Sequence, residues 1–495
     1  MGRSWRVGAG IVAAAAVAAG GLACDSDDDS GDGAGPGEGA EEVTGPVPEV
    51  EGPITGGIRG GPVNATPEDV LTDFGYVEDE YFLSGEATSY TPVGELASDG
   101  RWEVEEASPA PYTTRVLVRR PADLEDFNGT AVVEWFNVTG GLDVDPTFGL
   151  TYPAGFERGA VYIAVTAQAV GVEGGGPTIE VPEAGADLVA PLTVRDPERY
   201  GSLSHPGDDF SYDIVTQVGR AALAGDLTDG TQPGRLLLVG QSQSAGRIAT
   251  YINAIEPVED VYDGFLVHSR GDGAAPVAAE AAVQPPDVVM IRTDLDEEVL
   301  QFETEGDLER LGFIAARQDD TDRIVTWEVP GTAHADDTIL AFGQVSVGIE
   351  FDAAATCGSV NTGPHGEVLR AAFTGLDEWV TEGTTPPTSP RIETEGAAVV
   401  RDELGNAVGG IRTPQVDAPV SALSGVGEPG ASEFCGIFGS EVPFTPEQLA
   451  QLYPTHDDYV EAVTESAEAA VEAGFLLPAD RDAFVADAEA AAVPS

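Results

Sequence analysis

The pattern of hydrophobic and polar residues changes near residue 130 of the 495-residue chain. Before this point, short alternating runs such as residues 114–118 (TRVLV) indicate an antiparallel edge of a sheet. After it, short apolar runs alternate with amphipathic stretches, which predicts buried parallel strands separated by helices. The predicted strands are 131–136, 161–166, 236–239, 264–268, 288–291 and 324–329, and the predicted helices are 212–224, 246–255, 300–317 and 367–383.

This order of elements predicts an α/β fold, with a mainly parallel sheet covered by helices on both faces. The chemistry of such a sheet lies at the carboxyl ends of its strands. A hairpin-like region is expected at 391–425, and the helical spacing of apolar residues in 445–492 predicts two short helices packed on the main body.

The first residues of the chain have the composition of a targeting segment. Residues 1–23 contain no acid, and Arg3 and Arg6 precede an apolar stretch, 7–19, that is too short to span a membrane comfortably. The stretch runs into Gly-Leu-Ala-Cys24, which looks like a bacterial lipoprotein signal whose cysteine is lipidated; an ordinary secretory signal is the alternative.

We therefore expect four segments. These are a signal peptide at 1–23, an acidic tether rich in Gly and Pro at 24–51, a main domain at 52–440 and a C-terminal helical extension at 441–495. The protein is expected outside the cytoplasm, held at the membrane only by a lipid on Cys24, or secreted if the signal is of the ordinary kind.

The charge of the chain excludes some classes of partner. The 23 basic residues, all arginines, face 86 acidic ones, which gives a net charge of −63. Such a protein repels the phosphates of nucleic acids and of anionic lipids. Removal of residues 1–23 takes away two arginines and no acid, so the mature chain is more acidic still, at −65.

Two cysteines remain after Cys24, namely Cys357 and Cys435. An even number in an oxidising compartment predicts a disulfide between them, with two buried free thiols as the alternative.

A serine-centred motif follows the predicted strand 236–239. The segment Gly-Gln-Ser242-Gln-Ser244-Ala-Gly leads straight into a helix, and a strand, a tight turn of small residues around a serine and a helix together form a nucleophile elbow. Ser242 is the favoured nucleophile because it stands closer to the end of the strand, and Ser244 remains the alternative.

A serine hydrolase of this architecture supplies an acid and then a histidine later in the chain. The predicted strand 288–291 is followed by several acids, of which Asp296 is the first choice and Asp294 the second. His334 lies in a glycine-containing loop after the strand 324–329, which suits the general base. A triad of Ser242, Asp296 and His334 is the resulting hypothesis.

Further residues are expected around this site. The backbone N–H of Gln243 is one candidate donor for an oxyanion, and the N–H groups of Val138 and Thr139, in the glycine-rich segment after strand 131–136, are the others. His268 and Arg270 follow another strand end and either line the substrate pocket or are buried structural partners.

Several longer segments resemble a bacterial group of secreted alpha/beta hydrolase domain proteins whose substrate is not agreed. They include GTAVVEWFNVTGG (129–141), RYGSLSHPGDDFSYDI (199–214), GQSQSAGRIATYINA (240–254), WEVPGTAHAD (327–336) and PFTPEQLAQLYPTHDDYV (443–460). The resemblance covers most of the chain from about residue 52, and it implies an alpha/beta-hydrolase fold with a serine-centred triad.

The expected function is that of a carboxylesterase-like serine hydrolase acting on a small-molecule ester through an acyl-enzyme. This chemistry requires no metal and no organic cofactor. An amidase or peptidase would use the same residues, and a non-catalytic cell-surface binding module is the alternative from another class of protein.

Overall fold

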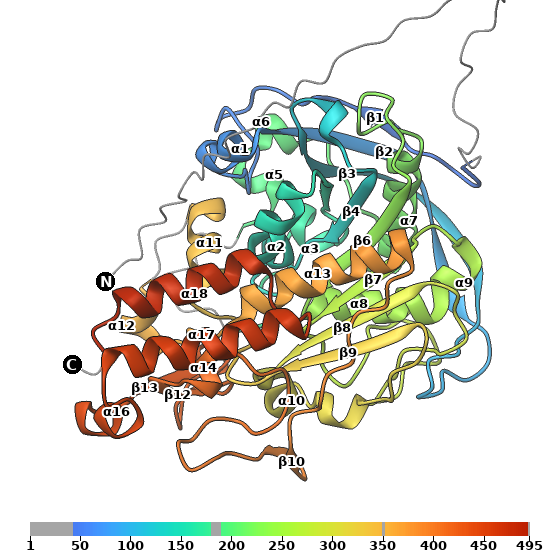
Figure 1. The fold of residues 1–495 in the computed structure, drawn as a ribbon. Helices are drawn as coiled ribbons and strands as arrows, with labels where there is room; N and C mark the ends of the chain where they lie inside the picture. The colour runs from blue at the N-terminus through green and yellow to red at the C-terminus, as the bar shows by residue number, and fades with distance from the viewer. Residues whose placement is uncertain (1–42, 180–189, 349–351, 494–495) are drawn as a thin grey trace, which may run out of the picture. The chain divides into compact units, whose positions relative to one another are not determined.

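Nine strands form one mixed sheet in the residues that the computed structural model describes, 43–179, 190–348 and 352–493 (Figure 1). Along the sheet the order is β1-β2-β3-β5-β4-β6-β7-β8-β9; β1, β2, β3 and β5 are antiparallel neighbours, and all pairs from β5 to β9 are parallel. The strands are β1 Glu49–Glu51, β2 Tyr76–Pro92, β3 Val104–Pro121, β4 Thr130–Trp135, β5 Val161–Val165, β6 Arg235–Gln241, β7 Gly264–His268, β8 Glu298–Thr304 and β9 Ile324–Val329.

The helices are mostly connections between these strands. They are α1 Glu68–Phe74, α2 Pro146–Glu157, α3 Ala169–Glu173, α5 Leu192–Arg195, α6 Pro197–Tyr200, α7 Ser211–Leu223, α8 Gln243–Thr250, α9 Glu256–Glu259, α10 Glu305–Arg310, α11 Asp337–Val347, α12 Ala353–Cys357, α13 His365–Glu382, α14 Pro414–Asp417, α15 Glu433–Gly436, α16 Pro446–Leu452, α17 His456–Glu472 and α18 Pro478–Ala490. A π-helical segment, Tyr251–Ile255, joins α8 to α9.

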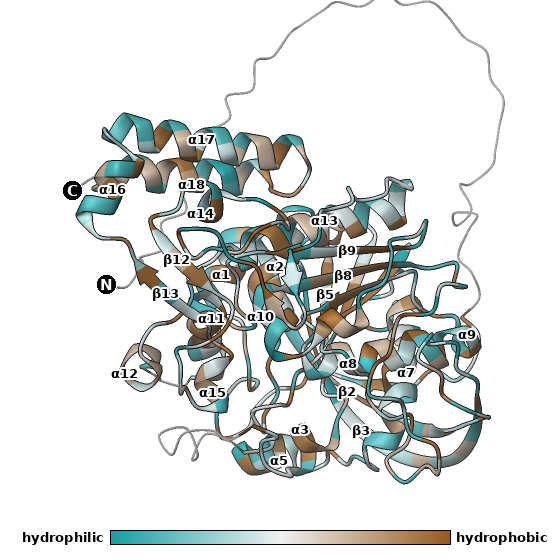
Figure 2. Ribbon diagram, turned by 90° about the horizontal axis from the view of Figure 1, so that it is seen from below, coloured by the Kyte–Doolittle hydropathy of each residue, from teal (hydrophilic) through white to brown (hydrophobic). Residues whose placement is uncertain are grey.

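The central strands are apolar on both faces because helices cover both sides of the sheet. In β6, Leu236 and Leu238 pack in a core with residues of α7 and α8, while Leu237 and Val239 point to the other face and pack with residues of α2 and α13. In Figure 2 apolar residues are concentrated in β8 and β9, whereas α17 alternates apolar and polar positions. The predicted fold class is therefore confirmed.

The C-terminal region contains three helices, α16, α17 and α18, where the sequence predicts two. Helices α17 and α18 pack against each other, and α17 also contacts α14 (Figure 1). Asp480 of α18 accepts hydrogen bonds from Arg370 of α13, and the ring of Phe475 lies 5.0 Å from that of Trp327 in β9. These contacts attach the helices to the sheet domain. Two small antiparallel sheets of two strands precede them, β10 Thr394–Glu395 with β11 Ala398–Val399, and β12 Ser421–Ser424 with β13 Ser440–Pro443.

Three further sequence-based predictions of elements are wrong. Residues 288–291 form no strand; instead Val289 and Met290 donate backbone hydrogen bonds to the loop residues Asp272 and Ser98. The stretch 300–317 is not one helix, because it starts inside β8 and continues as α10. The segment 114–118 lies within β3, which is flanked by β2 and β5 and is not at the edge.

Candidate active site

Ser242 lies in the sharp turn between β6 and α8. Its backbone has φ 64° and ψ −118°, a conformation that costs a non-glycine residue on the order of 1–3 kcal/mol and persists only where the surrounding structure imposes it. Its N–H donates to the carbonyl of His268 at 2.9 Å. A Cβ at Gly240 would stand 3.0 Å from the side chains of Ile248 and Ser244. The turn therefore needs a very small residue at 240, and it presents the Ser242 hydroxyl at the start of α8.

The two candidate serines have different surroundings. Ser244 is fully buried, and its hydroxyl donates to the carbonyl of Phe136 at 3.1 Å. Ser242 is only half-buried, and its Oγ lies 2.9 Å from Nε2 of His334. The structure thus places Ser242, and not Ser244, against the candidate base.

His334 is fixed from several sides in the loop that follows β9. Its carbonyl accepts a hydrogen bond from the Gln241 side chain at 2.9 Å, so the end of β6 holds the histidine beside Ser242. The next residue, Ala335, donates its N–H to the carbonyl of Ile437 at 3.0 Å. The imidazole is almost entirely buried, which excludes most solvent from the Ser242–His334 contact.

The carboxylate that meets His334 belongs to Asp307, in the first turn of α10. Its Oδ1 lies 2.6 Å from His334 Nδ1. Its Oδ2 accepts from both the N–H and the hydroxyl of Thr304 at 2.7 Å, and Thr304 Oγ1 in turn accepts from the Asp307 N–H. This reciprocal capping box at the start of α10 holds one oxygen and leaves the other for the histidine.

The surroundings of Asp307 favour its ionised form. Burial alone would raise the pKa of this carboxyl, but the nearby His334 and the hydrogen bonds from His334 and Thr304 outweigh it and hold the pKa below its usual value. The group is therefore a buried carboxylate at neutral pH, suited to fix the tautomer of the imidazole and to stabilise its positive form.

Neither Asp296 nor Asp294 is near this histidine, which corrects the expectation for the acid. Both are exposed and lie before β8, whereas Asp307 follows it. Asp294 accepts hydrogen bonds from Arg292 and lies 3.7 Å from Arg101. The error has a single cause: the sequence places the strand at 288–291, one segment too early, so the acid is sought at the wrong end of β8. The capping motif Thr304-Glu-Gly-Asp307 after the apolar residues of β8 is the signal that would have found it.

Of the three expected oxyanion donors, one is engaged elsewhere and two have no acceptor in the described part of the chain. The Thr139 N–H donates to the Asn137 side chain at 2.8 Å, so it is already engaged. The N–H groups of Gln243 and Val138 have no acceptor among residues 43–179, 190–348 and 352–493. Gln243 begins α8, where the partial positive charge of the helix adds to its N–H. The Asn137 side chain also donates to the carbonyl of Gln241, which joins the two segments.

His268 and Arg270 are buried structural residues, so the expectation that they line the substrate pocket is corrected. Both are fully inaccessible. His268 Nε2 lies 2.7 Å from Nε2 of His365. Arg270 donates to the Gln301 side chain at 2.9 Å, and burial lowers its pKa to about 10. His268 is the last residue of β7 and Arg270 follows two residues later, and it is the carbonyl of His268, not its side chain, that contacts the elbow through the Ser242 N–H.

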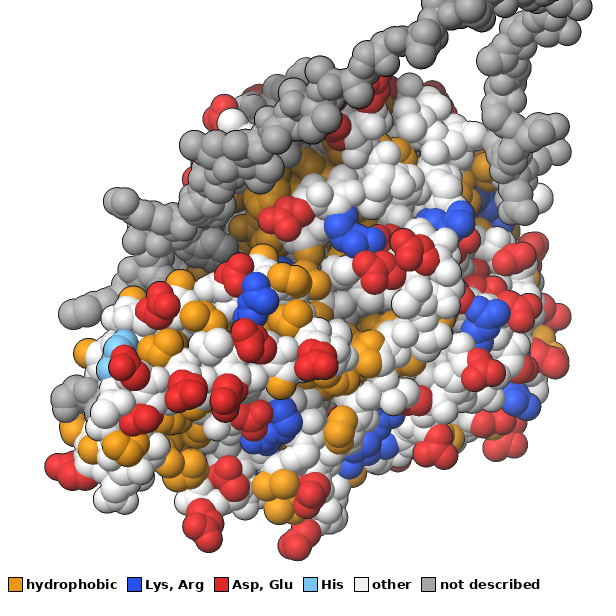
Figure 3. All heavy atoms as spheres, in the orientation of Figure 1, with side chains coloured by type: hydrophobic (Ala, Val, Ile, Leu, Met, Phe, Trp, Pro, Cys, Tyr) orange, Lys and Arg blue, Asp and Glu red, His pale blue; other side chains and the backbone are white. Residues whose placement is uncertain are grey.

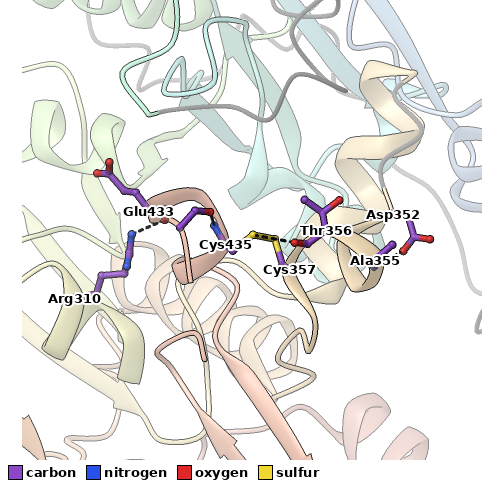
Figure 4. The surroundings of a disulfide bond; sticks show 8 residues. Arg310, Asp352, Ala355, Thr356, Cys357, Glu433 and Cys435 are labelled. Carbon is purple, nitrogen blue, oxygen red and sulfur yellow. Dashed lines mark hydrogen bonds between the residues drawn. A yellow bond between two sulfur atoms is a disulfide. The ribbon is translucent and has the colours of Figure 1, made fainter. Parts of the chain in front are cut away.

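Cys357 and Cys435 form a disulfide in the structure (Figure 4). The bond joins the end of α12 to α15 across 78 residues of sequence. Near it, the Arg310 side chain of α10 donates to the carbonyl of Glu433. The disulfide thus lies beside the segment whose Ile437 carbonyl holds the His334 loop.

The lipidation candidate Cys24, the signal at 1–23 and most of the tether lie outside the described residues. Within the described part of the chain, none of the helices has the length and apolarity that crossing a membrane requires.

The fold and the site together define an alpha/beta hydrolase, in which a serine on a strand–turn–helix elbow meets a histidine from a later loop. A family model described as an alpha/beta hydrolase domain matches residues 50–486, and the chain belongs to this family. A search of curated proteins finds no match.

Among solved structures, the chain is similar to several hydrolases at low sequence identity. A putative dienelactone hydrolase from Klebsiella pneumoniae subsp. pneumoniae is 12% identical, with a TM-score of 0.28 over 54% of this chain and 98% of that one. The esterase Est22 is 13% identical, with a TM-score of 0.29 over 57% and 78%. An alpha-beta serine hydrolase homologue from Coxiella burnetii is 11% identical, with a TM-score of 0.26 over 52% and 95%.

Proposed function

We propose that this alpha/beta hydrolase cleaves a carboxylic ester of a small molecule by a serine acyl-enzyme mechanism, with Ser242, His334 and Asp307 as its triad. The observation that carries the proposal is the continuous series of contacts, 2.9 Å from Ser242 Oγ to His334 Nε2 and 2.6 Å from His334 Nδ1 to Asp307. These are the distances at which a base removes the proton of a nucleophile and is itself oriented by a carboxylate.

In the first half of the reaction, Ser242 Oγ forms a bond to the ester carbonyl carbon while its proton passes to His334 Nε2. Asp307 stabilises the imidazolium, and the N–H groups of Gln243 and Val138 stabilise the negatively charged oxygen of the resulting tetrahedral intermediate. Collapse of this intermediate breaks the ester bond, and the alcohol leaves with the proton from His334.

In the second half, His334 removes a proton from water, whose oxygen attacks the acyl carbon. The acyl–Ser242 bond then breaks, the serine regains its proton from His334 and the carboxylic acid is released. The net reaction is ester hydrolysis, which consumes one water molecule for each ester cleaved.

The test combines a fluorophosphonate probe, which labels activated serines, with a panel of p-nitrophenyl esters. We expect the wild type to be labelled and active, and Ser242→Ala to lose labelling and to lower kcat by about four to six orders of magnitude. Ser244→Ala is the matched control: it removes a buried hydrogen bond and about 1 kcal/mol of stability, but leaves labelling intact.

Three results would contradict the proposal. A wild type that is neither labelled nor active would favour a binding module, and hydrolysis of anilides faster than of matched esters would favour an amidase. Loss of labelling only in Ser244→Ala would reassign the nucleophile.

The anchoring of the enzyme is a second part of this proposal, supported by the sequence around Cys24. We expect full-length protein expressed in bacteria to sediment with membranes and to incorporate labelled palmitate. Cys24→Ala should abolish the labelling. A variant that is labelled as well as the wild type would exclude this cysteine as the lipidation site.

A further inference from the structure

Three carboxylates from two separate segments converge away from the triad. Glu256 begins α9, Asp260 directly follows this helix, and Glu297 directly precedes β8. One oxygen of each lies within 4.8 Å of the other two. The two segments, 37 or more residues apart in sequence, thus bring three carboxylates together. Their mutual repulsion is unfavourable unless a cation lies between them.

The deepest of the three, Glu256, has an unsatisfied oxygen. Its side chain is only 1% exposed. Oε1 accepts the backbone N–H groups of Val261 and Tyr262, at 2.8 and 3.1 Å, while the buried Oε2 has no hydrogen-bond partner in the described part of the chain. The buried Oε2 of Glu297 also has no partner there. Buried carboxylate oxygens are nearly always paired with a donor or a metal ion, so two in one cluster indicate a missing ligand.

Arginines do not compensate this charge. None of the described arginines forms an ion pair with Glu256, Asp260 or Glu297, although Arg220 and Arg323 pair with the adjacent acids Glu259 and Glu298.

We propose that Glu256, Asp260 and Glu297 bind one calcium ion. The ligands are all carboxylate oxygens, which select a hard cation over zinc or copper. Calcium takes oxygens at about 2.3–2.6 Å, so that ligands on opposite sides of it stand up to about 5 Å apart, and one ion can contact all three groups. Asp260 is exposed, which leaves room for the water molecules that complete its shell.

Calcium fits this cluster better than magnesium does. Magnesium demands near-ideal octahedral geometry and keeps most of its water, whereas calcium accepts irregular, partly protein-made shells. The backbone of Asp260 is in the left-handed region, φ 48° and ψ 66°, and the N–H groups that hold Glu256 Oε1 fix that carboxylate. The cluster is therefore an irregular set of ligands on a partly rigid frame.

The position of the cluster gives the ion a structural role. The cluster joins α9 to the amino end of β8, whose other end leads to Asp307. Helix α9 continues the helical segment that starts at the Ser242 elbow. The ion would join these two segments at the amino ends of the strands, whereas the triad lies at their carboxyl ends. Stability, rather than the chemistry of Ser242, is thus the property that calcium should change.

The test measures calcium binding by calorimetry on the EDTA-treated full chain, with thermal unfolding as the second readout. About 0.5 M NaCl suppresses weak binding to the acidic surface. Wild type should bind one calcium ion and melt at a higher temperature in calcium than in EDTA. Asp260→Asn and Glu297→Gln should bind at least about tenfold more weakly, because each removes one ligand charge. Asparagine also tolerates the left-handed conformation of residue 260.

Asp296→Asn is the matched control, since it removes an adjacent exposed charge that is not among the three ligands. It should bind calcium and gain thermal stability as the wild type does. Absence of saturable binding to the wild type would overturn the proposal, because the three carboxylates would then share protons instead. Equal binding by all four proteins would do so too, and magnesium binding as tight as calcium binding would overturn the choice of ion.

Discussion

Two aspartates on either side of β8 allow a matched test of which carboxylate orients His334. Asp307 contacts the histidine and Asp296 does not. Asp307→Asn should keep the size of the side chain but favour the wrong tautomer of His334, so kcat should fall by about 10⁴-fold. Asp296→Asn should stay within about twofold of the wild type, since it is a surface substitution. Ester hydrolysis by both purified variants measures this; similar losses in both would contradict the assignment of Asp307.

The buried histidine pair behind the site predicts a response to acid. Burial lowers the pKa of His365 from 6.5 to about 4 and that of His268 well below its usual value. As the pH falls below 6.5, these histidines become protonated in the unfolded chain but stay neutral in the folded protein. The free energy of unfolding therefore decreases. For His365 alone the loss amounts to about 3 kcal/mol at pH 4.

A comparison with His365→Gln isolates this effect, because the buried carboxyls Glu134 and Asp336, whose pKa values are raised to about 8, act in the opposite direction in both proteins. Thermal unfolding from pH 7 to pH 4.5 should show a smaller decline in the variant than in the wild type. Equal declines would show that His365 does not contribute to the acid response.

At the scale of elements, the disulfide between α12 and α15 carries a prediction on stability. It closes a loop across 78 residues, and in the loop-entropy account a crosslink of this length stabilises the folded state by about 4 kcal/mol. Cys357→Ser with Cys435→Ser, or reduction of the wild type, should lower the midpoint of thermal unfolding. The double variant itself should not respond to reductant, which provides the control. An unchanged midpoint in fully reduced wild type would contradict the prediction.

The strands predicted from the sequence agree with the structure at β7 and β9 but not at β8. The predicted strands at 264–268 and 324–329 match β7 and β9. Both are short runs rich in β-branched and aromatic residues and are set apart from their neighbours by loops. The sequence does not predict β8, because this strand runs into α10 without a loop and its residues are taken as the start of the helix 300–317. Gln301 and Glu303 also interrupt its apolar run. These polar side chains are buried in the sheet, and Gln301 is paired with Arg270, a partner that no local pattern reveals.

At the scale of the whole molecule, the acidic surface predicts a dependence on salt. The net charge is −63, and acidic side chains are spread over the face shown in Figure 3 with few arginines between them. Repulsion among these charges opposes the compact state, and salt screens it. The midpoint of thermal unfolding at neutral pH should therefore rise steadily from low to molar NaCl. The rise should shrink near pH 4, where many carboxyls are protonated; a midpoint that is independent of salt at pH 7 would exclude this account.

The sequence by itself determined the fold class, the elbow around Ser242 and the loop of His334, because each depends on short stretches whose pattern is local. Only the tertiary structure decided which acid contacts the histidine. Asp307 reaches His334 from the carboxyl end of β8, and the local sequence pattern does not reveal that strand. The same holds for the burial of His268 and Arg270 and for the meeting of Glu256 with Glu297. These depend on which segments distant in sequence become neighbours, and the packing of the sheet sets that choice.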